Sequence, residues 1–205
     1  MTVKTPSLLL ILFTYTLSLQ AYQRCIKRTP ENNHGRKPAV FVGNEEFEVT
    51  NGRLAALIPR LSTEWELSVS LRMRSEIPRG DPKVPRCNII HVEAAKPGLY
   101  GFRTPQISLE KSDQRMVISS AVNNDHNFKI NFFELKINQT IRLWIQQRYM
   151  SNGEYKFEVK INGTVIGSAV NKEARQFYDA SVWMSGPLYE TCPVSISNFK
   201  ITNFL

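Results

Sequence analysis

Residues 64–74 read EWELSVSLRMR, and apolar side chains alternate with polar ones along the whole stretch. One face carries Trp65, Leu67, Val69, Leu71 and Met73, whereas the other face carries only charged residues and serines. Successive side chains of a β-strand point to opposite faces, so this alternation predicts a strand with one buried face. The fold is therefore expected to be built from antiparallel sheets that cover a shared core.

A second alternating stretch lies at residues 154–161, which read EYKFEVKI. Asn162-Gly163 follows it, and Asn152-Gly153 precedes it; Asn-Gly is the preferred pair for a two-residue hairpin turn. Ile141, Leu143 and Ile145 form a further period-two segment upstream. Residues 141–168 are therefore predicted to form a three-stranded antiparallel meander.

Further short strands are expected along the rest of the chain, with turn residues between them. They are Phe47–Val49, Leu54–Ile58, Asn88–Glu93, Gln106–Glu110, Met116–Val122, Phe128–Phe133, Ser181–Met184 and Val194–Thr202. Many short strands at this spacing are typical of an all-β sandwich or barrel. The one helical turn we expect lies at Asn171–Phe177.

Four stretches resemble the concanavalin A-like, or laminin G-like, jelly-roll domain of secreted invertebrate proteins. They are TEWELSVSLRMRS, NIIHVEA, GEYKFEVKINGTVIG and the ending FYDASVWMSGPLYETCPVSISNFKITNF. The resemblance covers about residues 40–205. It implies an antiparallel two-sheet jelly-roll sandwich, which we expect to form a single domain over residues 39–205. It leaves function open, because this fold hosts lectins, hydrolases, adhesion modules and matrix proteins.

The N-terminus predicts secretion. Residues 1–21 combine Lys4, an apolar run from Leu8 to about Leu19 and a small residue, Ala21, at a plausible cleavage point. The run is too short for a comfortable membrane span, and no second apolar stretch approaches that length, so we expect no membrane insertion. Residues 22–38 are polar and basic without periodicity, which indicates a flexible arm.

The net charge is +8, and this excess favours acidic or sulfated glycans or anionic surfaces as partners. Nothing in the chain resembles a nucleic-acid-binding module, and a secretory route argues against that partner. The three histidines lie far apart and the cysteines lack zinc-site spacing, so neither a metal site nor a cofactor is expected.

Three cysteines in an oxidising compartment predict one disulfide and one remaining thiol. We favour Cys87–Cys192, because both residues sit at predicted strand ends, with Cys25 free or bound to another chain. Cys25–Cys192 is the alternative. Asn138 and Asn162 begin Asn-x-Thr sequons and are predicted to be glycosylated surface residues.

Catalysis is not expected. Glucanases of the resembled fold carry carboxylates at i, i+2 and i+4 of one strand, where they share a face. Glu64 and Glu66 have the two-residue step, but Ser68 occupies the third position. Glu46 and Glu48 are likewise followed by a threonine, and both pairs are interpreted as solvated strand faces.

Two sets of residues are candidates for ligand binding by their residue type. Asn123-Asn124-Asp125 offers oxygen ligands for calcium, but Asn and Asp are also ordinary turn formers, and a turn is the favoured interpretation. Trp144, Tyr149 and Tyr178 are candidates for stacking on a glycan. Trp144 alternates with Leu143 and Ile145, which predicts that it faces outward.

Residues 75–87 contain Arg79-Gly80-Asp81 among prolines, between two predicted strands. The neighbourhood, IPRGD followed by RC, resembles the integrin-binding loop of snake-venom disintegrins. The resemblance implies that Arg79 enters an acidic pocket and that Asp81 binds a metal ion on the receptor. An accidental tripeptide in a basic loop is the alternative.

The sequence thus predicts a secreted, non-catalytic adhesion or binding protein of the extracellular matrix, with integrins or other cell-surface or matrix proteins as partners. A lectin-like glycan-binding protein and a secreted toxin or venom component are the alternatives.

Overall fold

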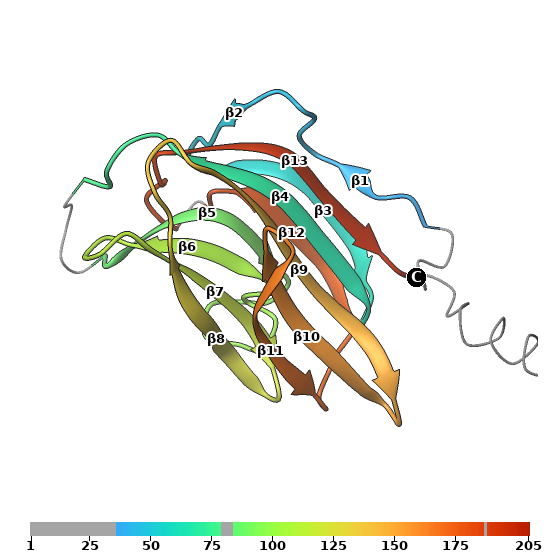
Figure 1. The fold of residues 1–205 in the computed structure, drawn as a ribbon. Helices are drawn as coiled ribbons and strands as arrows, with labels where there is room; N and C mark the ends of the chain where they lie inside the picture. The colour runs from blue at the N-terminus through green and yellow to red at the C-terminus, as the bar shows by residue number, and fades with distance from the viewer. Residues whose placement is uncertain (1–35, 79–83, 187) are drawn as a thin grey trace, which may run out of the picture. The chain divides into compact units, whose positions relative to one another are not determined.

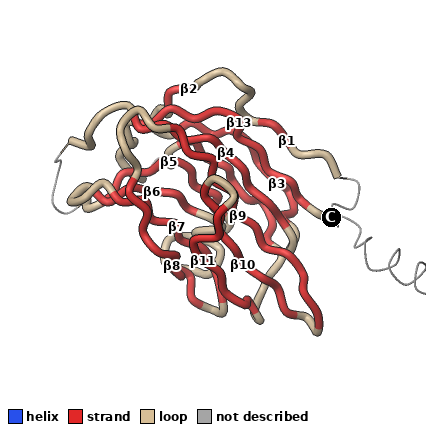
Figure 2. The backbone as a smooth tube through the Cα atoms, in the orientation of Figure 1, coloured by secondary structure: helices blue, strands red, loops and turns tan. Residues whose placement is uncertain are grey.

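The computed structural model describes residues 36–78, 84–186 and 188–205, and residues 36–205 form one compact unit. The described residues contain strands, turns and loops without a helix, so none of them forms a helix that could cross a membrane (Figure 2). The strands assemble into two antiparallel sheets packed face to face, a jelly-roll sandwich (Figure 1).

One sheet has seven strands in the order β1-β13-β4-β9-β10-β11, with β2 also pairing with β13. Its strands are β1 (Ala39–Val40), β2 (Phe47–Glu48), β4 (Trp65–Met73), β9 (Thr140–Ser151), β10 (Glu154–Ile161), β11 (Thr164–Asn171) and β13 (Val194–Asn203). The last strand, β13, lies between the short strands β1 and β2 and the long strand β4.

The other sheet has six strands in the order β3-β12-β5-β6-β7-β8. Its strands are β3 (Arg53–Leu61), β5 (Arg86–Glu93), β6 (Gln106–Glu110), β7 (Arg115–Val122), β8 (Asp125–Glu134) and β12 (Phe177–Met184). Successive strands of this sheet come from distant parts of the chain at β3-β12-β5, so only the folded chain brings them together.

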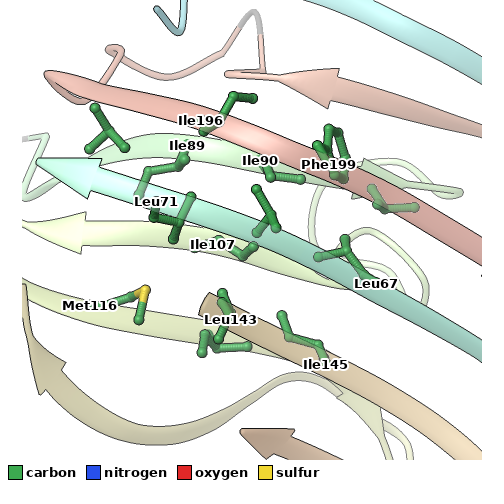
Figure 3. Close-up of a cluster of buried hydrophobic side chains, with 14 of the residues drawn as sticks. Leu67, Leu71, Ile89, Ile90, Ile107, Met116, Leu143, Ile145, Ile196 and Phe199 are labelled. Carbon is green, nitrogen blue, oxygen red and sulfur yellow. The ribbon is translucent and has the colours of Figure 1, made fainter. Parts of the chain in front are cut away.

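The core lies between the sheets and is built by the apolar face of each strand. The labelled side chains of Figure 3 come from β4, β9 and β13 on one side and from β5, β6 and β7 on the other. Leu67, Leu71, Ile90, Ile107 and Ile145 are all fully buried. Each such side chain stabilises the fold by about 1.5–3 kcal/mol relative to an exposed one.

The alternation in residues 64–74 predicted β4 correctly, including the buried face of Trp65 to Met73. The meander is also confirmed as β9-β10-β11. Asn152 and Asn162 adopt positive φ values of 52° and 50° in its two turns, as Asn-Gly hairpins require.

The short strand β1 was not predicted from the sequence, and the helical turn expected at Asn171–Phe177 was wrong. The segment between β11 and β12 is a loop because the buried Asn171 side chain bonds the backbone N–H two residues on, which competes with a helical turn, and also bonds residues outside the segment. Asn171 Oδ1 accepts from Asn123 N and from Glu173 N, and Asn171 Nδ2 donates to Gln147.

A disulfide joins Cys87 on β5 to Cys192, which precedes β13, with an S–S distance of 2.07 Å. It links a strand of the six-stranded sheet to the chain entering the seven-stranded sheet. This is the pairing that was favoured from the sequence. Cys25, residues 1–21 and the segment 22–35 lie outside the described residues.

Candidate functional site

A groove of ≈ 840 Å³ lies over the outer face of the seven-stranded sheet. Its floor comes from β4, where Ser68 and Ser70 alternate with the core residues Leu67, Val69 and Leu71. Because serine side chains are small, the outer surface of the sheet is recessed along β4, and the longer side chains on β9 and β13 protrude on both sides of it. The alternation that buries one face of β4 therefore also shapes the groove on the other.

The walls come from β9 and β13, which flank β4. Arg142 and Trp144 on β9 pair in register with Ser70 and Ser68, and Lys200 on β13 pairs with Ser68 from the opposite side. Asn198 also lines the groove; it has a φ of 52° within a bulge of β13. Such a bulge redirects side chains locally.

The end of the groove is closed by the hairpin turn between β10 and β11. Asn162 and Gly163 of this turn line the groove together with Asn44. Asn162 Oδ1 accepts a hydrogen bond from the Arg142 backbone N–H at 2.8 Å, which fixes the turn against β9.

Trp144 is the large aromatic residue of this site, and 38% of its surface is exposed. Lys160 on β10 pairs with it in register and places its Nζ 4.9 Å from the centroid of the ring. Lys160 does not line the groove, so the cation approaches the indole from the β10 side. The indole surface toward β4 is thus the part that a ligand in the groove can contact.

The charge at the groove is positive. Arg142 and Lys200 are the two charged residues among its described lining residues. Two glutamates lie next to the groove on the same face, Glu66 on β4 and Glu158 on β10. Glu158 pairs with Lys156 and, at 3.0 Å, with Lys160, and Glu66 accepts a hydrogen bond from the Trp144 side chain. An anion entering the groove therefore meets guanidinium and ammonium groups.

These two glutamates differ in pKa. Burial raises the pKa of Glu66, although Arg148, a hydrogen bond from the Trp144 side chain and Lys160 oppose the shift. For Glu158, burial acts in the same direction but is outweighed by hydrogen bonds and charge from Lys156 and Lys160, so its pKa is lowered. The side chain of Trp144 is thus held by a hydrogen bond to Glu66 and by the Lys160 ammonium group against its ring.

Three of the four glutamates in the two candidate catalytic pairs form ion pairs with arginines. Glu46 pairs with Arg72 at 3.0 Å and Glu48 with Arg74 at 2.6 Å, in a second hollow farther along the same face that Asn138 also lines. Glu64 pairs with Arg148 at 3.1 Å. These three acids therefore lie in ion pairs on the sheet surface, whereas Glu66 accepts a hydrogen bond from the Trp144 side chain.

The aromatic candidates for glycan stacking do not form one site. Tyr149 is exposed at the far end of β9, where its ring packs against Tyr155 at 5.4 Å between centroids. Tyr178 is exposed on β12 of the other sheet. Trp144 faces outward as predicted and is the candidate that the fold places in the groove.

The segment Asn123-Asn124-Asp125 is a turn, as favoured from its sequence. Asn123 and Asn124 have φ values of 51° and 63°, and their side-chain oxygens accept from Lys172 N and from Arg175. Across the described part of the chain, no group of three or more His, Cys, Asp or Glu side chains is arranged to hold a metal ion.

Arg79, Gly80 and Asp81 lie outside the described residues, between β4 and β5. The sequon residues Asn138 and Asn162 are both exposed, and both lie on the outer face of the seven-stranded sheet. Arg142, Lys200 and Asn198 were not among the site residues predicted from the sequence. Arg142 carries a usable signal, since it alternates with the buried Ile141 and Leu143, but Lys200 becomes a neighbour of Trp144 only through sheet pairing.

No protein-family model matches the chain, and no curated protein matches it in sequence. Among solved structures, it is similar to the binding domain of botulinum neurotoxin serotype G, with 15% identity and a TM-score of 0.50. The match covers 83% of this chain and 44% of the toxin domain, so this chain spans less than half the length of that domain.

Two further solved structures are similar to this chain with lower TM-scores. The SAP-like pentraxin from Limulus polyphemus has 14% identity and a TM-score of 0.48, covering 83% of this chain and 78% of the pentraxin. The alginate lyase vAL-1 from Chlorella virus has 12% identity and a TM-score of 0.44, covering 82% and 90%. The similar structures thus include both binding domains and enzymes, and at these identities the comparison supports the jelly-roll fold alone.

Proposed function

We propose that this protein is a secreted, non-catalytic carbohydrate-binding protein that takes anionic glycans into the groove on its seven-stranded sheet. The observation that carries the proposal is the half-exposed indole of Trp144 beside Arg142 and Lys200 over a floor of serines. Binding sites are typically concave, with an apolar surface and a few convergent polar groups, and this groove has that composition.

The parts of the groove match the parts of an acidic sugar. The apolar face of a pyranose ring packs on an indole, which buries carbon surface on both partners. Arg142 offers the forked guanidinium donors that suit carboxylate or sulfate, and Lys200 supplies a point charge across the groove. Ser68 and Asn198 provide hydroxyl and amide groups for hydrogen bonds with sugar hydroxyls.

Binding is favoured over catalysis because the acids near the groove are already engaged. Glu158 pairs with Lys156 and Lys160, Glu64 bonds Arg148, and Glu66 accepts a hydrogen bond from the Trp144 side chain. Incubation with each bound polysaccharide, followed by analysis of chain length and of unsaturated products, tests this part of the proposal. Turnover of any of these polysaccharides would contradict the proposal and show that the protein is an enzyme.

The proposal is tested by titrating heparin-derived, alginate-derived and neutral oligosaccharides of equal length against purified protein. We expect saturable binding of the anionic oligosaccharides that weakens with salt. Trp144→Ala and Lys200→Ala should each weaken it about tenfold, a loss of about 1.4 kcal/mol. Tyr178→Ala and Lys129→Ala, exposed residues on the other sheet, are matched controls that should bind normally. Equal binding by Trp144→Ala and the unmodified chain would refute the proposal.

The integrin-directed adhesion predicted from Arg79-Gly80-Asp81 is a second candidate. Its support is the disulfide of Cys87, which fixes the point where the segment after β4 enters β5. A segment held at its base loses less entropy on docking. Cell attachment to immobilised protein should require divalent cations and fall with Asp81→Glu. Attachment that is unchanged by this substitution would remove the integrin as a partner.

A further inference from the structure

Asn162 lies at the edge of the groove and also begins a sequon. It occupies the turn between β10 and β11, and the sequon is completed by Thr164, the first residue of β11. Asn162, Gly163 and Thr164 are all exposed, so the segment is accessible to a glycosyltransferase. The residue that would carry the glycan is therefore a lining residue of the proposed binding site.

The side chain of Asn162 is held in a defined direction. Its backbone N–H donates to the Arg142 carbonyl at 2.8 Å, and its Oδ1 accepts from the Arg142 N–H at 2.8 Å. With Oδ1 directed at β9, the remaining side-chain atom, Nδ2, is the atom to which a glycan is attached. The attachment point is thus fixed beside Arg142, because these two hydrogen bonds restrict rotation of the Asn162 side chain.

The distance from this point to Trp144 is short. Trp144 follows Arg142 by two residues on β9, which corresponds to about 7 Å along a strand. The first sugars of an N-glycan span more than this distance. Gly163, without a side chain, adds no bulk between Asn162 and the groove.

We propose that an N-glycan on Asn162 lies in the groove, packs against Trp144 and excludes the free ligand. Occupancy of the groove by the glycan does not depend on the proposed function, whereas exclusion of a free ligand rests on it. The glycan thus acts as a tethered inhibitor, and its trimming or absence exposes the site.

Because the glycan is attached at the edge of the groove, even a weak contact is sufficient for it to occupy the groove. A sugar attached at the edge of the groove has an effective concentration in the millimolar range, so it occupies the groove even when its free counterpart would bind poorly. If the tethered sugar fills the groove nine-tenths of the time, the apparent Kd for the free ligand rises about tenfold.

The second sequon provides a built-in comparison. Asn138 lines the other hollow of the same sheet face, together with the ion-paired side chains of Glu46, Glu48, Arg72 and Arg74. No aromatic residue is among the described residues that line this second hollow. A glycan on Asn138 is therefore expected to leave both Trp144 and the groove unaffected.

The experiment uses the full chain secreted from a eukaryotic cell line, with Thr164→Ala and Thr140→Ala as matched variants. Each substitution removes one sequon but keeps its asparagine, so the hydrogen bonds of Asn162 to Arg142 are retained. Glycopeptide mass spectrometry establishes occupancy. Acrylamide quenching of tryptophan fluorescence then reports the exposure of Trp144, and Trp144→Phe identifies its share of the signal.

We expect Thr164→Ala to raise the quenching of Trp144 and to bind a heparin-derived hexasaccharide about tenfold more tightly than the glycosylated chain. Thr140→Ala should change neither quantity. The proposal is wrong if Asn162 is unmodified in the secreted protein, or if quenching of Trp144 is the same with and without its glycan. Increased quenching without hexasaccharide binding by any form would support the occupancy of the groove and reject the proposed ligand instead.

Discussion

His91 makes the stability of this fold sensitive to acid. It lies on β5 with 1% of its surface exposed, and its Nε2 is 2.7 Å from the carbonyl oxygen of Phe102. That carbonyl requires a proton on Nε2, so the neutral ring is an Nε2–H donor. Burial lowers the pKa of His91 from 6.5 to about 4; the Phe102 hydrogen bond opposes the shift, and the charge of Arg103 adds to it.

The sign of the effect follows from proton binding. In the unfolded chain His91 takes up its proton near pH 6.5, whereas in the folded chain it does so only near pH 4. The unfolded state therefore binds more protons between these values, and stability falls as the pH falls through that window. A pKa difference of about 2.5 corresponds to about 3.5 kcal/mol in full; about 3 kcal/mol of this is lost at pH 4, where His91 in the folded chain is half protonated.

The assay is urea unfolding at pH 7 and at pH 4, followed by tryptophan fluorescence, for the wild-type chain and for His91→Gln. Glutamine keeps a donor for the Phe102 carbonyl but does not titrate. Glu93, 3.7 Å from His91 Nδ1, has a pKa raised by burial and acts in the opposite direction, but it is present in both proteins. The wild-type chain should lose about 3 kcal/mol more than the variant. Equal losses in the two proteins would refute the reasoning.

Three other substitutions test the packing of the sandwich by the same unfolding assay. Replacing Cys87 and Cys192 by alanine opens a disulfide that spans 105 residues and should cost about 4–5 kcal/mol; a loss below about 1 kcal/mol would contradict this expectation. Phe157→Ala removes a fully buried ring and should cost about 3–5 kcal/mol, so a neutral result would place the ring outside the core. Gly167→Ala brings a Cβ to 2.5 Å from an isoleucine side chain on β8 and should cost about 1–3 kcal/mol, whereas Gly43→Ala, with nothing within 4 Å, should be nearly neutral.

The strands were largely predictable because the pattern that defines them is local. The alternation around Leu67 and Leu71 on β4 and the Asn-Gly turn at Asn162 each act within a few residues, and the structure confirms both. β1 was missed because its two residues gain their strand geometry from pairing with β13, at the other end of the chain.

Polar residues show where alternation alone is insufficient. His91, Asn88 and Ser119 are almost completely buried although their residue types are typical of a solvated face. His91 is covered by the rings of Phe102 and Tyr189, which belong to the loops after β5 and after β12. A pattern within β5 carries no information about loops that close over it.

The candidate site likewise has one part that the sequence predicted and another that only the fold brings together. Alternation on β9 predicted that Trp144 faces outward, and this is confirmed. The charge partner Lys200 and the turn residue Asn162 are 56 and 18 positions away in the sequence, and sheet order decides that they share a groove with Trp144. Sequence spacing says nothing of this arrangement, because β4, β9 and β13 become neighbours only through long-range pairing.

The sequence by itself determined most of the strands, their buried faces and the hairpins of the meander, whereas it left Cys25–Cys192 open beside the Cys87–Cys192 disulfide that the structure contains. Those features depend on period-two alternation and on turn chemistry, which neighbouring residues set. The tertiary structure decided the order of strands in each sheet, and through it the groove, its positive charge and the place of Asn162 at its edge. Hydrogen bonding between strands that are distant in sequence is what assembles a binding face from residues that share no local pattern.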